Sequence, residues 1–129
     1  MLIGELAERA GTSARTVRYY EQHGLVQPGR SANGYRVYDE HELDIVRKIR
    51  GLLELGFDLV DARPFVTCLR AGHRSGDECP ESVESLRRRL AEIDDAMDAL
   101  STARRELSAR ISAVAGPPPK CEFSPEGTI

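Results

Sequence analysis

A long amphipathic stretch near the end of the chain constrains the fold more than any other sequence feature. From Glu81 to Ala115, apolar residues follow a 3-4 spacing that is interrupted only at Arg104, which predicts one seam along a helix. The seam consists of Val83, Leu86, Leu90, Ile93, Met97, Leu100, Leu107, Ile111 and Val114. Such a helix is roughly 50 Å long, and Gly116 with the prolines after it must end it. The seam needs a partner, and a second copy of the chain is the simplest one.

The rest of the chain is small. The sequence has 129 residues, of which 40% are apolar and 30% charged, and it has no Trp. This composition predicts one small domain beside the long helix. The sequence has neither an apolar run of membrane-spanning length nor a secretion signal. We therefore expect a cytoplasmic protein with no membrane association.

Changes of pattern divide the chain into four segments. Residues 1–72 form a domain with many glycines, and residues 73–80 are a short polar linker. Residues 81–115 are the dimerisation helix, and residues 116–129 are a C-terminal tail. The net charge of −3 does not exclude nucleic acid, because cations gathered on one face are enough to bind it.

The first segment begins with a candidate helix-turn-helix. Apolar residues at helical spacing predict a first short helix that Gly11 ends. Thr12 or Ser13 then caps a second short helix, and Gly24 stops that one.

A hairpin and two more helices follow. Leu25–Val26 and residues 35–38 look like strands, and Asn33-Gly34 between them is a tight-turn dipeptide. Asp39 and Glu42 form a capping-box pattern at the start of a third helix.

The third helix ends at Gly56, and Asp58 caps a fourth. Pro64 falls inside that fourth helix and should kink it or shift its start.

Arginine and tyrosine gather on the second helix and on the hairpin. Arg15, Arg18 and Tyr19 are spaced to share one helix face. Arginine bonds guanine edges bidentately or holds phosphates, so this face suits the major groove of DNA. The hairpin adds Arg30, Tyr35, Arg36 and Tyr38. Each tyrosine taken alone is explained as well by packing, but the combination favours a wing that contacts the DNA backbone.

An ordered series of motifs runs through the first segment: Ile3-Gly4-Glu5-Leu6-Ala7, Gly11, Arg18-Tyr19-Tyr20-Glu21, Gly24-Leu25-Val26, Pro28, Arg30, Gly34-Tyr35-Arg36-Val37-Tyr38 and Leu55-Gly56-Phe57. This series resembles the signature of the MerR family of bacterial transcription regulators. The resemblance covers residues 1 to about 70 closely, and the long helix in pattern.

The resemblance implies a mostly α-helical fold, in which a winged helix-turn-helix domain precedes a long antiparallel coiled-coil dimerisation helix. It implies a homodimer on a pseudo-palindromic operator in double-stranded promoter DNA. Family activators distort the spacer between promoter elements, and so act on RNA polymerase indirectly. The implied DNA contacts are Arg15, Thr16, Arg18, Tyr19, Tyr35, Arg36, Tyr38 and, on the third helix, Arg50.

The effector depends on the cysteines. Metal-sensing members carry one cysteine at the head of the dimer helix and two in a short C-terminal loop. Here Cys79 takes the first position and Cys121 alone the second. In an antiparallel dimer these two residues approach each other, and they hold a soft metal ion, with His73 as a further ligand, or close a disulfide. Otherwise both are unpaired surface thiols, and Cys68 is a small core residue.

Other functions remain open at this point. An organic ligand at the dimer interface, or no effector at all, is also compatible with the sequence. A helical adaptor that binds another protein is the alternative from a different class, and a steep salt dependence of duplex binding separates the two. The sequence contains no phosphate-cradling loop, nucleophile elbow or His-Glu-x-x-His motif, so we expect no enzyme.

Overall fold

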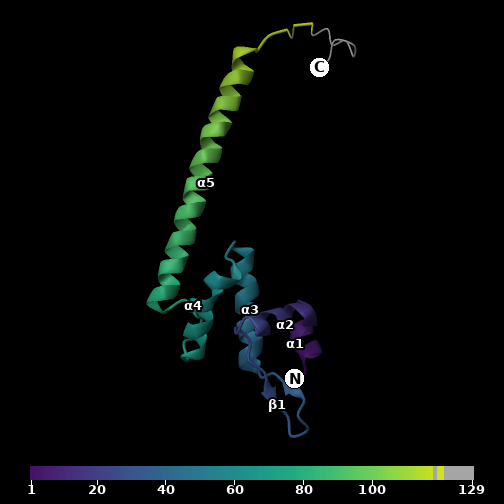
Figure 1. Cartoon of the computed structure of the whole chain (residues 1–129). Coiled ribbons are helices and arrows are strands. Elements are labelled where there is room, and N and C mark those ends of the chain that lie inside the picture. Colours follow the sequence, from purple (N-terminus) through teal and green to yellow (C-terminus); the bar gives the residue numbers. More distant parts are fainter. Residues whose placement is uncertain (118, 121–129) are drawn as a thin grey trace. The chain divides into compact units, whose positions relative to one another are not determined.

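The computed structural model describes residues 1–117, 119 and 120. Within this part, the elements follow the order α1 (Ile3–Ala10), α2 (Ala14–Gln22), β1 (Gly29–Arg30), β2 (Arg36–Val37), α3 (Glu40–Glu54), α4 (Leu59–Arg70) and α5 (Pro80–Ala113) (Figure 1). The chain is therefore mostly α-helical, as the sequence predicts. It divides into two compact units, Met1–Leu90 and Ala91–Ile129.

Side-chain caps fix where three of the helices begin. Ser13, Asp39 and Asp58 each accept a hydrogen bond from the backbone N–H three residues further on, at 3.1, 3.0 and 2.8 Å. These bonds satisfy N–H groups that have no partner in the first helical turn. The predicted caps at Asp39 and Asp58 are confirmed, and Ser13 rather than Thr12 caps α2. Pro64 lies inside α4 without shifting its start.

Glycines end the first four helices in the same way. Gly11, Gly24, Gly56 and Gly72 have left-handed φ angles between 72° and 97°. At each one, the glycine N–H and the next N–H bond back to carbonyls of the last turn, which is a Schellman motif. The stops predicted at Gly11, Gly24 and Gly56 are confirmed.

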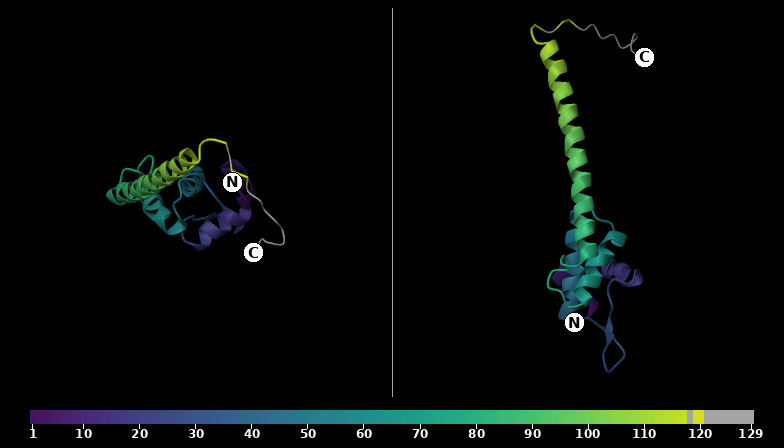
Figure 2. Two further views of the ribbon diagram at one scale, coloured as in Figure 1. Left: turned by 90° about the horizontal axis from the view of Figure 1, so that it is seen from above. Right: turned by 90° about the vertical axis from the view of Figure 1, so that its left-hand side faces the viewer.

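A short hairpin follows α2 and projects from the helices of the unit Met1–Leu90 (Figures 1 and 2). Its two strands are antiparallel, and the paired residues are Gly29 with Val37 and Arg30 with Arg36. Gly34 has a φ of 81°, and its N–H donates to the Ser31 carbonyl at 2.9 Å. The predicted turn at Asn33-Gly34 is confirmed.

The strand predicted at Leu25–Val26 is wrong. These residues lie in the connection between α2 and β1, and both are buried. Arg70 donates to the Leu25 carbonyl at 2.8 Å, and both of its terminal nitrogens lie 2.9 Å from the Glu42 carboxylate. That carboxylate also accepts from the Gln27 N–H at 2.7 Å. Glu42 therefore does not close the predicted capping box; it forms an ion pair that holds the connection against α3 and α4.

Apolar side chains from α1 to α4 form one core. Residues exposed by 1% or less include Leu6, Val17, Leu25, Val26, Tyr38, Leu43, Ile45, Val46, Ile49, Ala62 and Phe65. The rings of Phe57 and Phe65 meet edge to face with centroids 5.5 Å apart. This core fixes the helix-turn-helix on the α3–α4 pair.

The first turns of α5 pack within the unit Met1–Leu90. Ser82 and Ser85 are buried there, and Leu86 packs against the core of its own chain. Arg89 donates from Nε to the Leu55 carbonyl at 2.8 Å. The sequence assigns Leu86 to the dimer seam, whereas the structure uses it for packing inside one chain. A half-buried Val83 lies on the same turns.

The part of α5 from Ala91 to Ala113 has no buried residue. Its apolar seam residues expose between 36% and 70% of their surface, and they are Ile93, Met97, Leu100, Leu107 and Ile111. Among the described residues, no helix combines the length and the apolar character that crossing a membrane requires.

Candidate DNA-binding surface and cysteine site

Helix α2 presents different side chains to the core and to solvent. Val17 and Tyr20 are 0% and 3% exposed, and they fix the rotation of the helix about its axis. The opposite face carries Arg15, Arg18 and Tyr19, all exposed as predicted. Two guanidinium groups and one phenol therefore lie on the solvent-exposed face of α2, where a partner can contact them.

Two residues of this helix also make local contacts. The hydroxyl of Thr16, a predicted DNA contact, is 3.0 Å from the Ser13 hydroxyl within the N-cap of α2. The ring of Tyr19 lies 4.3 Å from the ring of His23, centroid to centroid. His23 Nδ1 lies 2.8 Å from the Tyr19 carbonyl oxygen. These contacts restrict the conformations of Thr16 and Tyr19 before any partner binds.

The carboxylate of Glu21 connects α2 to the hairpin. Its Oε1 lies 3.5 Å from Arg36 Nε, and its Oε2 accepts from the Tyr38 hydroxyl at 3.1 Å. Burial of the ring, and then the nearby Glu21 charge, raise the pKa of Tyr38. Tyr38 is 1% exposed, so the prediction that it contacts DNA is corrected: it is a core residue that orients the wing. Tyr35, near the tip, is 66% exposed.

We use the name DNA-facing surface for the exposed side chains of α2 and the hairpin that the sequence predicts as DNA contacts; it consists of Arg15, Arg18, Tyr19, Tyr35 and Arg36. Arg50, the predicted contact on α3, is half-buried and donates to the Ala10 carbonyl at 2.6 Å. A Cβ on Gly11 would come within 2.9 Å of the same guanidinium. Arg50 thus also closes the end of α1, a role that the sequence does not predict.

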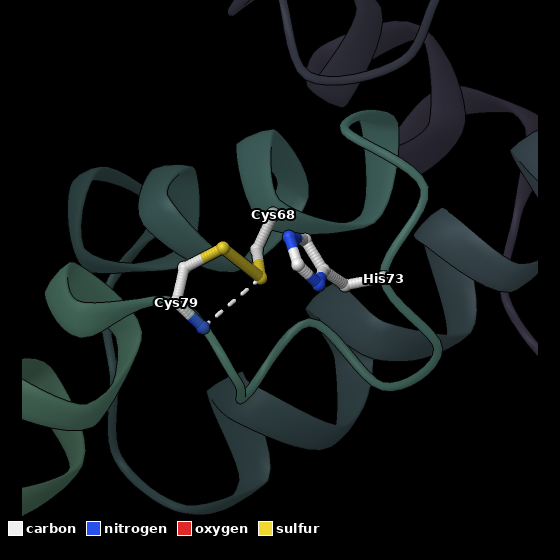
Figure 3. A group of neighbouring side chains, drawn as sticks. All are labelled: Cys68, His73 and Cys79. Atoms are coloured by element: carbon white, nitrogen blue, oxygen red, sulfur yellow. Dashed lines mark hydrogen bonds between the residues drawn. A yellow bond between two sulfur atoms is a disulfide. The ribbon is translucent and has the colours of Figure 1, made fainter.

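Three side chains able to ligate a metal ion meet where α4 connects to α5 (Figure 3). They are Cys68 in α4, His73 in the connection and Cys79 just before α5, and their ligand atoms all lie within 4.8 Å of one another. A disulfide joins Cys68 and Cys79, whose Cα atoms are 5.9 Å apart. We name these three residues the cysteine site.

The cysteine site corrects two predictions. Cys68 is buried, as predicted, but it is bonded to Cys79 and is not only a packing residue. Cys79 therefore has a partner in its own chain, where the sequence pointed to Cys121 of a second chain. Cys121 lies outside the described residues. The interpretation of Cys68 relied on its apolar neighbours in α4. A better indication that Cys68 belongs to a site is the glycine-histidine pair Gly72-His73, which follows it about one helical turn later.

Two glycines explain how the cysteine site assembles. In the Schellman motif at Gly72, the His73 N–H donates to the Cys68 carbonyl at 3.3 Å, which places His73 beside the last turn of α4. Gly76 is buried with a φ of 84°. A Cβ there would lie 2.8 Å from the Phe65 carbonyl oxygen. Glycine therefore lets the connection run close against α4 and return to Cys68.

Polar groups surround the sulfur of Cys68. The backbone N–H of Cys79 donates to Cys68 Sγ at 3.3 Å, and Glu78 Oε2 lies 3.8 Å from the same sulfur. The other Glu78 oxygen accepts from the N–H and hydroxyl of Ser75 at 3.0 and 2.9 Å. Hydrogen bonds from backbone N–H groups, first that of Ser75, lower the pKa of Glu78 to about 2. A negative charge therefore lies next to the site at neutral pH.

Known proteins are similar to this chain in sequence. The family model described as MerR HTH family regulatory protein matches residues 1–66. Over 119 residues the chain is 34% identical to the HTH-type transcriptional regulator HmrR of Rhizobium leguminosarum bv. viciae. That match covers 90% of this chain and 88% of the relative.

Solved structures share the fold. The transcription regulator PbrR691 from Ralstonia metallidurans CH34, in complex with lead(II), aligns with a TM-score of 0.67 and 30% identity. The alignment covers 84% of each chain. HiNmlR, a MerR family regulator lacking the sensor domain and bound to promoter DNA, aligns with a TM-score of 0.57 over 87% of this chain and 83% of its own. Its identity is 23%, so this second match concerns the fold alone.

Proposed function

The chain belongs to the MerR family of helix-turn-helix regulatory proteins, and from this premise we propose that it regulates transcription by binding double-stranded promoter DNA. Helix α2 enters the major groove, and the hairpin lies along the backbone as a wing. The protein works in the cytoplasm, where it reaches promoters, and acts on RNA polymerase through the geometry of the DNA.

The observation that carries the proposal is the DNA-facing surface. Arg15, Arg18 and Tyr19 are exposed on one short helix whose rotation is fixed by buried residues. Glu21 holds Arg36 of the hairpin beside that helix. Guanidinium groups on a helix of fixed rotation and on an adjacent hairpin suit bidentate contacts to guanine and to phosphates.

We further propose that the chain binds DNA as a homodimer. The exposed seam of α5 beyond Ala91 offers a row of large apolar side chains to a partner. An antiparallel copy of the same helix covers this row with matching residues. Two DNA-facing surfaces related by a two-fold axis then match a pseudo-palindromic operator.

The signal is a metal ion or a thiol-reactive compound. PbrR691, which is similar to this chain and was solved in complex with lead(II), suggests this class of signal. The donor set of this chain fits a thiophilic ion, because two sulfur atoms and one imidazole lie together in the cysteine site. The bound ion would supply a charge and a cross-link between α4 and α5.

The proposal is tested with a duplex that the protein selects from a random-sequence pool. Arg18→Ala should weaken binding to this duplex by about 1–3 kcal/mol if Arg18 contacts a base edge. The matched control is Arg110→Ala, which removes an exposed arginine of α5 that pairs with Glu106. Affinity is measured over a series of salt concentrations, because phosphate contacts give a steep salt dependence. Failure to enrich any duplex, or equal affinities for wild type and Arg18→Ala, would contradict the proposal.

A further inference from the structure

We propose that Cys68, His73 and Cys79 of a single chain form a binding site for a thiophilic metal ion of the Zn²⁺ class, and that the Cys68–Cys79 disulfide is the state that excludes the ion. The inference deepens the proposed function, on which its regulatory meaning rests. It places the sensing site inside one protomer, at the connection that leads into the dimerisation helix.

The three ligands come from three segments that the backbone brings together. Cys68 lies in α4, His73 in the connection after the Schellman motif, and Cys79 immediately before Pro80, the first residue of α5. Figure 3 shows the imidazole ring beside the paired sulfur atoms. A structural disulfide makes no use of a neighbouring imidazole, whereas an imidazole nitrogen is a common ligand in zinc sites that also contain cysteine.

The spacing suits a tetrahedral ion. Zinc–sulfur bonds of about 2.3 Å at tetrahedral angles place two sulfur ligands about 3.8 Å apart. The Cα atoms of Cys68 and Cys79 are 5.9 Å apart, so side-chain rotation separates the sulfurs to that distance once the disulfide is opened. The imidazole of His73 already lies within 4.8 Å of both sulfurs.

The surroundings favour thiolates and a cation. The Cys79 N–H points at Cys68 Sγ, and a hydrogen bond to sulfur stabilises its charged form. Cys79 precedes the N-terminus of α5, where the helix dipole favours a negative charge. The carboxylate of Glu78, whose Oε2 lies 3.8 Å from Cys68 Sγ, is placed where it would attract a cation held by the two sulfurs.

The cysteine site is open on the side of His73 and Cys79, whereas Cys68 is only 1% exposed. A surface cavity of about 360 Å³ is lined by Cys68, Cys79 and neighbouring residues of α4 and α5. Cys79 is half-buried and His73 is exposed, so an ion enters without opening the core.

The chemistry of the two states balances. Binding of Zn²⁺ by the two thiols and the neutral imidazole releases two protons. A phosphine opens the disulfide by giving it two electrons; water supplies the oxygen of the phosphine oxide and the two protons of the thiols. Metal binding and disulfide formation use the same sulfur lone pairs, so each state excludes the other.

The test compares the reduced and oxidised protein without DNA. Phosphine reduction should give three reactive thiols per chain, since the sequence has three cysteines. Oxidation by a small-molecule disulfide, which takes up the two electrons and two protons of Cys68 and Cys79 as it becomes two thiols, should leave one. Reduced protein is titrated with Zn²⁺ against a chromophoric chelator, and with Co²⁺ for sulfur-to-metal charge-transfer absorption. One ion should bind per chain, and the oxidised protein should bind at least 100-fold more weakly.

The variants decide which residues hold the ion. Cys68→Ala should abolish the charge-transfer signal or halve it, with at least 100-fold weaker binding, and His73→Gln should weaken binding at least tenfold. His73 is exposed, so its substitution leaves the fold intact. The matched controls are His41→Gln, at an exposed histidine of α3, and Cys121→Ser; both should bind as wild type does.

Two results with the variants would overturn the proposal. One is unchanged binding in Cys68→Ala or His73→Gln. The other is loss of binding in Cys121→Ser, which would move the site to a pair between chains. Affinity for the selected duplex is measured on the same samples. Metal binding without any duplex binding refutes the proposed function alone, and duplex binding without metal binding refutes this inference alone.

Discussion

The unit Met1–Leu90 and the stretch of α5 from Ala91 to Ala113 have apolar residues at similar helical spacing, but only the first buries them. Ile49 of α3 is 0% exposed, while Ile111 of α5 is 70% exposed. Between Ala91 and Ala113 every residue of α5 is exposed. An amphipathic pattern therefore states which face needs burial, but not which chain provides it. The first unit covers its own apolar faces, and in our account the second is covered by another copy.

The largest expected effect comes from charging the exposed seam. Leu100→Asp combined with Leu107→Asp should dissociate the dimer and weaken binding to the selected duplex by on the order of 100-fold or more, because a monomer engages one half-site and loses avidity. Sedimentation equilibrium and duplex titration measure the two effects. The control is Thr102→Asp with Ala109→Asp, which places the same charges on the other face of the helix. Tight duplex binding by a proven monomer would contradict the claim that a second copy of the chain covers the seam.

A matched pair of isoleucines, one in each part of the chain, tests which chain buries each apolar face. Ile49→Ala should cost about 2–5 kcal/mol of unfolding free energy, because it leaves a cavity in a core that its own chain closes. Ile111→Ala should instead raise the dimer dissociation constant, so its loss of unfolding free energy should appear at protein concentrations above the wild-type dissociation constant and vanish well below it. Denaturant titrations at two protein concentrations separate these outcomes. A concentration-independent loss in Ile111→Ala would argue that the seam packs within one chain.

The ion pair between Glu42 and Arg70 stabilises only the first unit. Arg70→Met should lower the unfolding free energy by about 3 kcal/mol, because it leaves the carboxylate of Glu42 without its cation. Glu42 is only 5% exposed. The control is Arg9→Met, which breaks the exposed pair with Glu40 and should leave the unfolding midpoint almost unchanged. Equal losses of unfolding free energy in the two variants would show that burial does not determine how much each ion pair contributes to stability.

The smallest effect concerns Tyr38. Tyr38→Phe removes the hydrogen bond to Glu21 and should lower the unfolding free energy by about 0.5–1.5 kcal/mol. Burial raises the pKa of Tyr38, so the folded protein holds this proton more tightly than the unfolded chain does. That contribution is complete below the ordinary tyrosine pKa of about 10 and is lost as the pH rises through the folded value. Unfolding free energies between pH 8 and 11 should therefore fall less steeply in Tyr38→Phe than in wild type.

Local signals predicted most of the first unit. The caps Asp39 and Asp58 and the glycine stops act within one helical turn, so their effect can be predicted from the sequence alone. The wrong strand at Leu25–Val26 has a tertiary cause. The guanidinium of Arg70, which lies 45 residues further along the chain, donates a hydrogen bond to the Leu25 carbonyl, which would otherwise be free to pair in a sheet.

The site residues divide in the same way. Spacing on one helix predicted the exposure of Arg15, Arg18 and Tyr19. The burial of Tyr38 depends on packing against α2, and the pairing of Cys68 with Cys79 depends on how Gly76 lets the connection return to α4. Neither contact follows from spacing along one element.

The most direct test of our account counts the chains on one DNA molecule. Native mass spectrometry of the wild-type protein with its selected duplex, at concentrations near the dissociation constant, reports the stoichiometry. We predict two chains per duplex, with no complex of one chain at comparable affinity, because the exposed seam of α5 pairs two DNA-facing surfaces. A stable complex of one chain per duplex would contradict the claim that α5 is covered by a second copy.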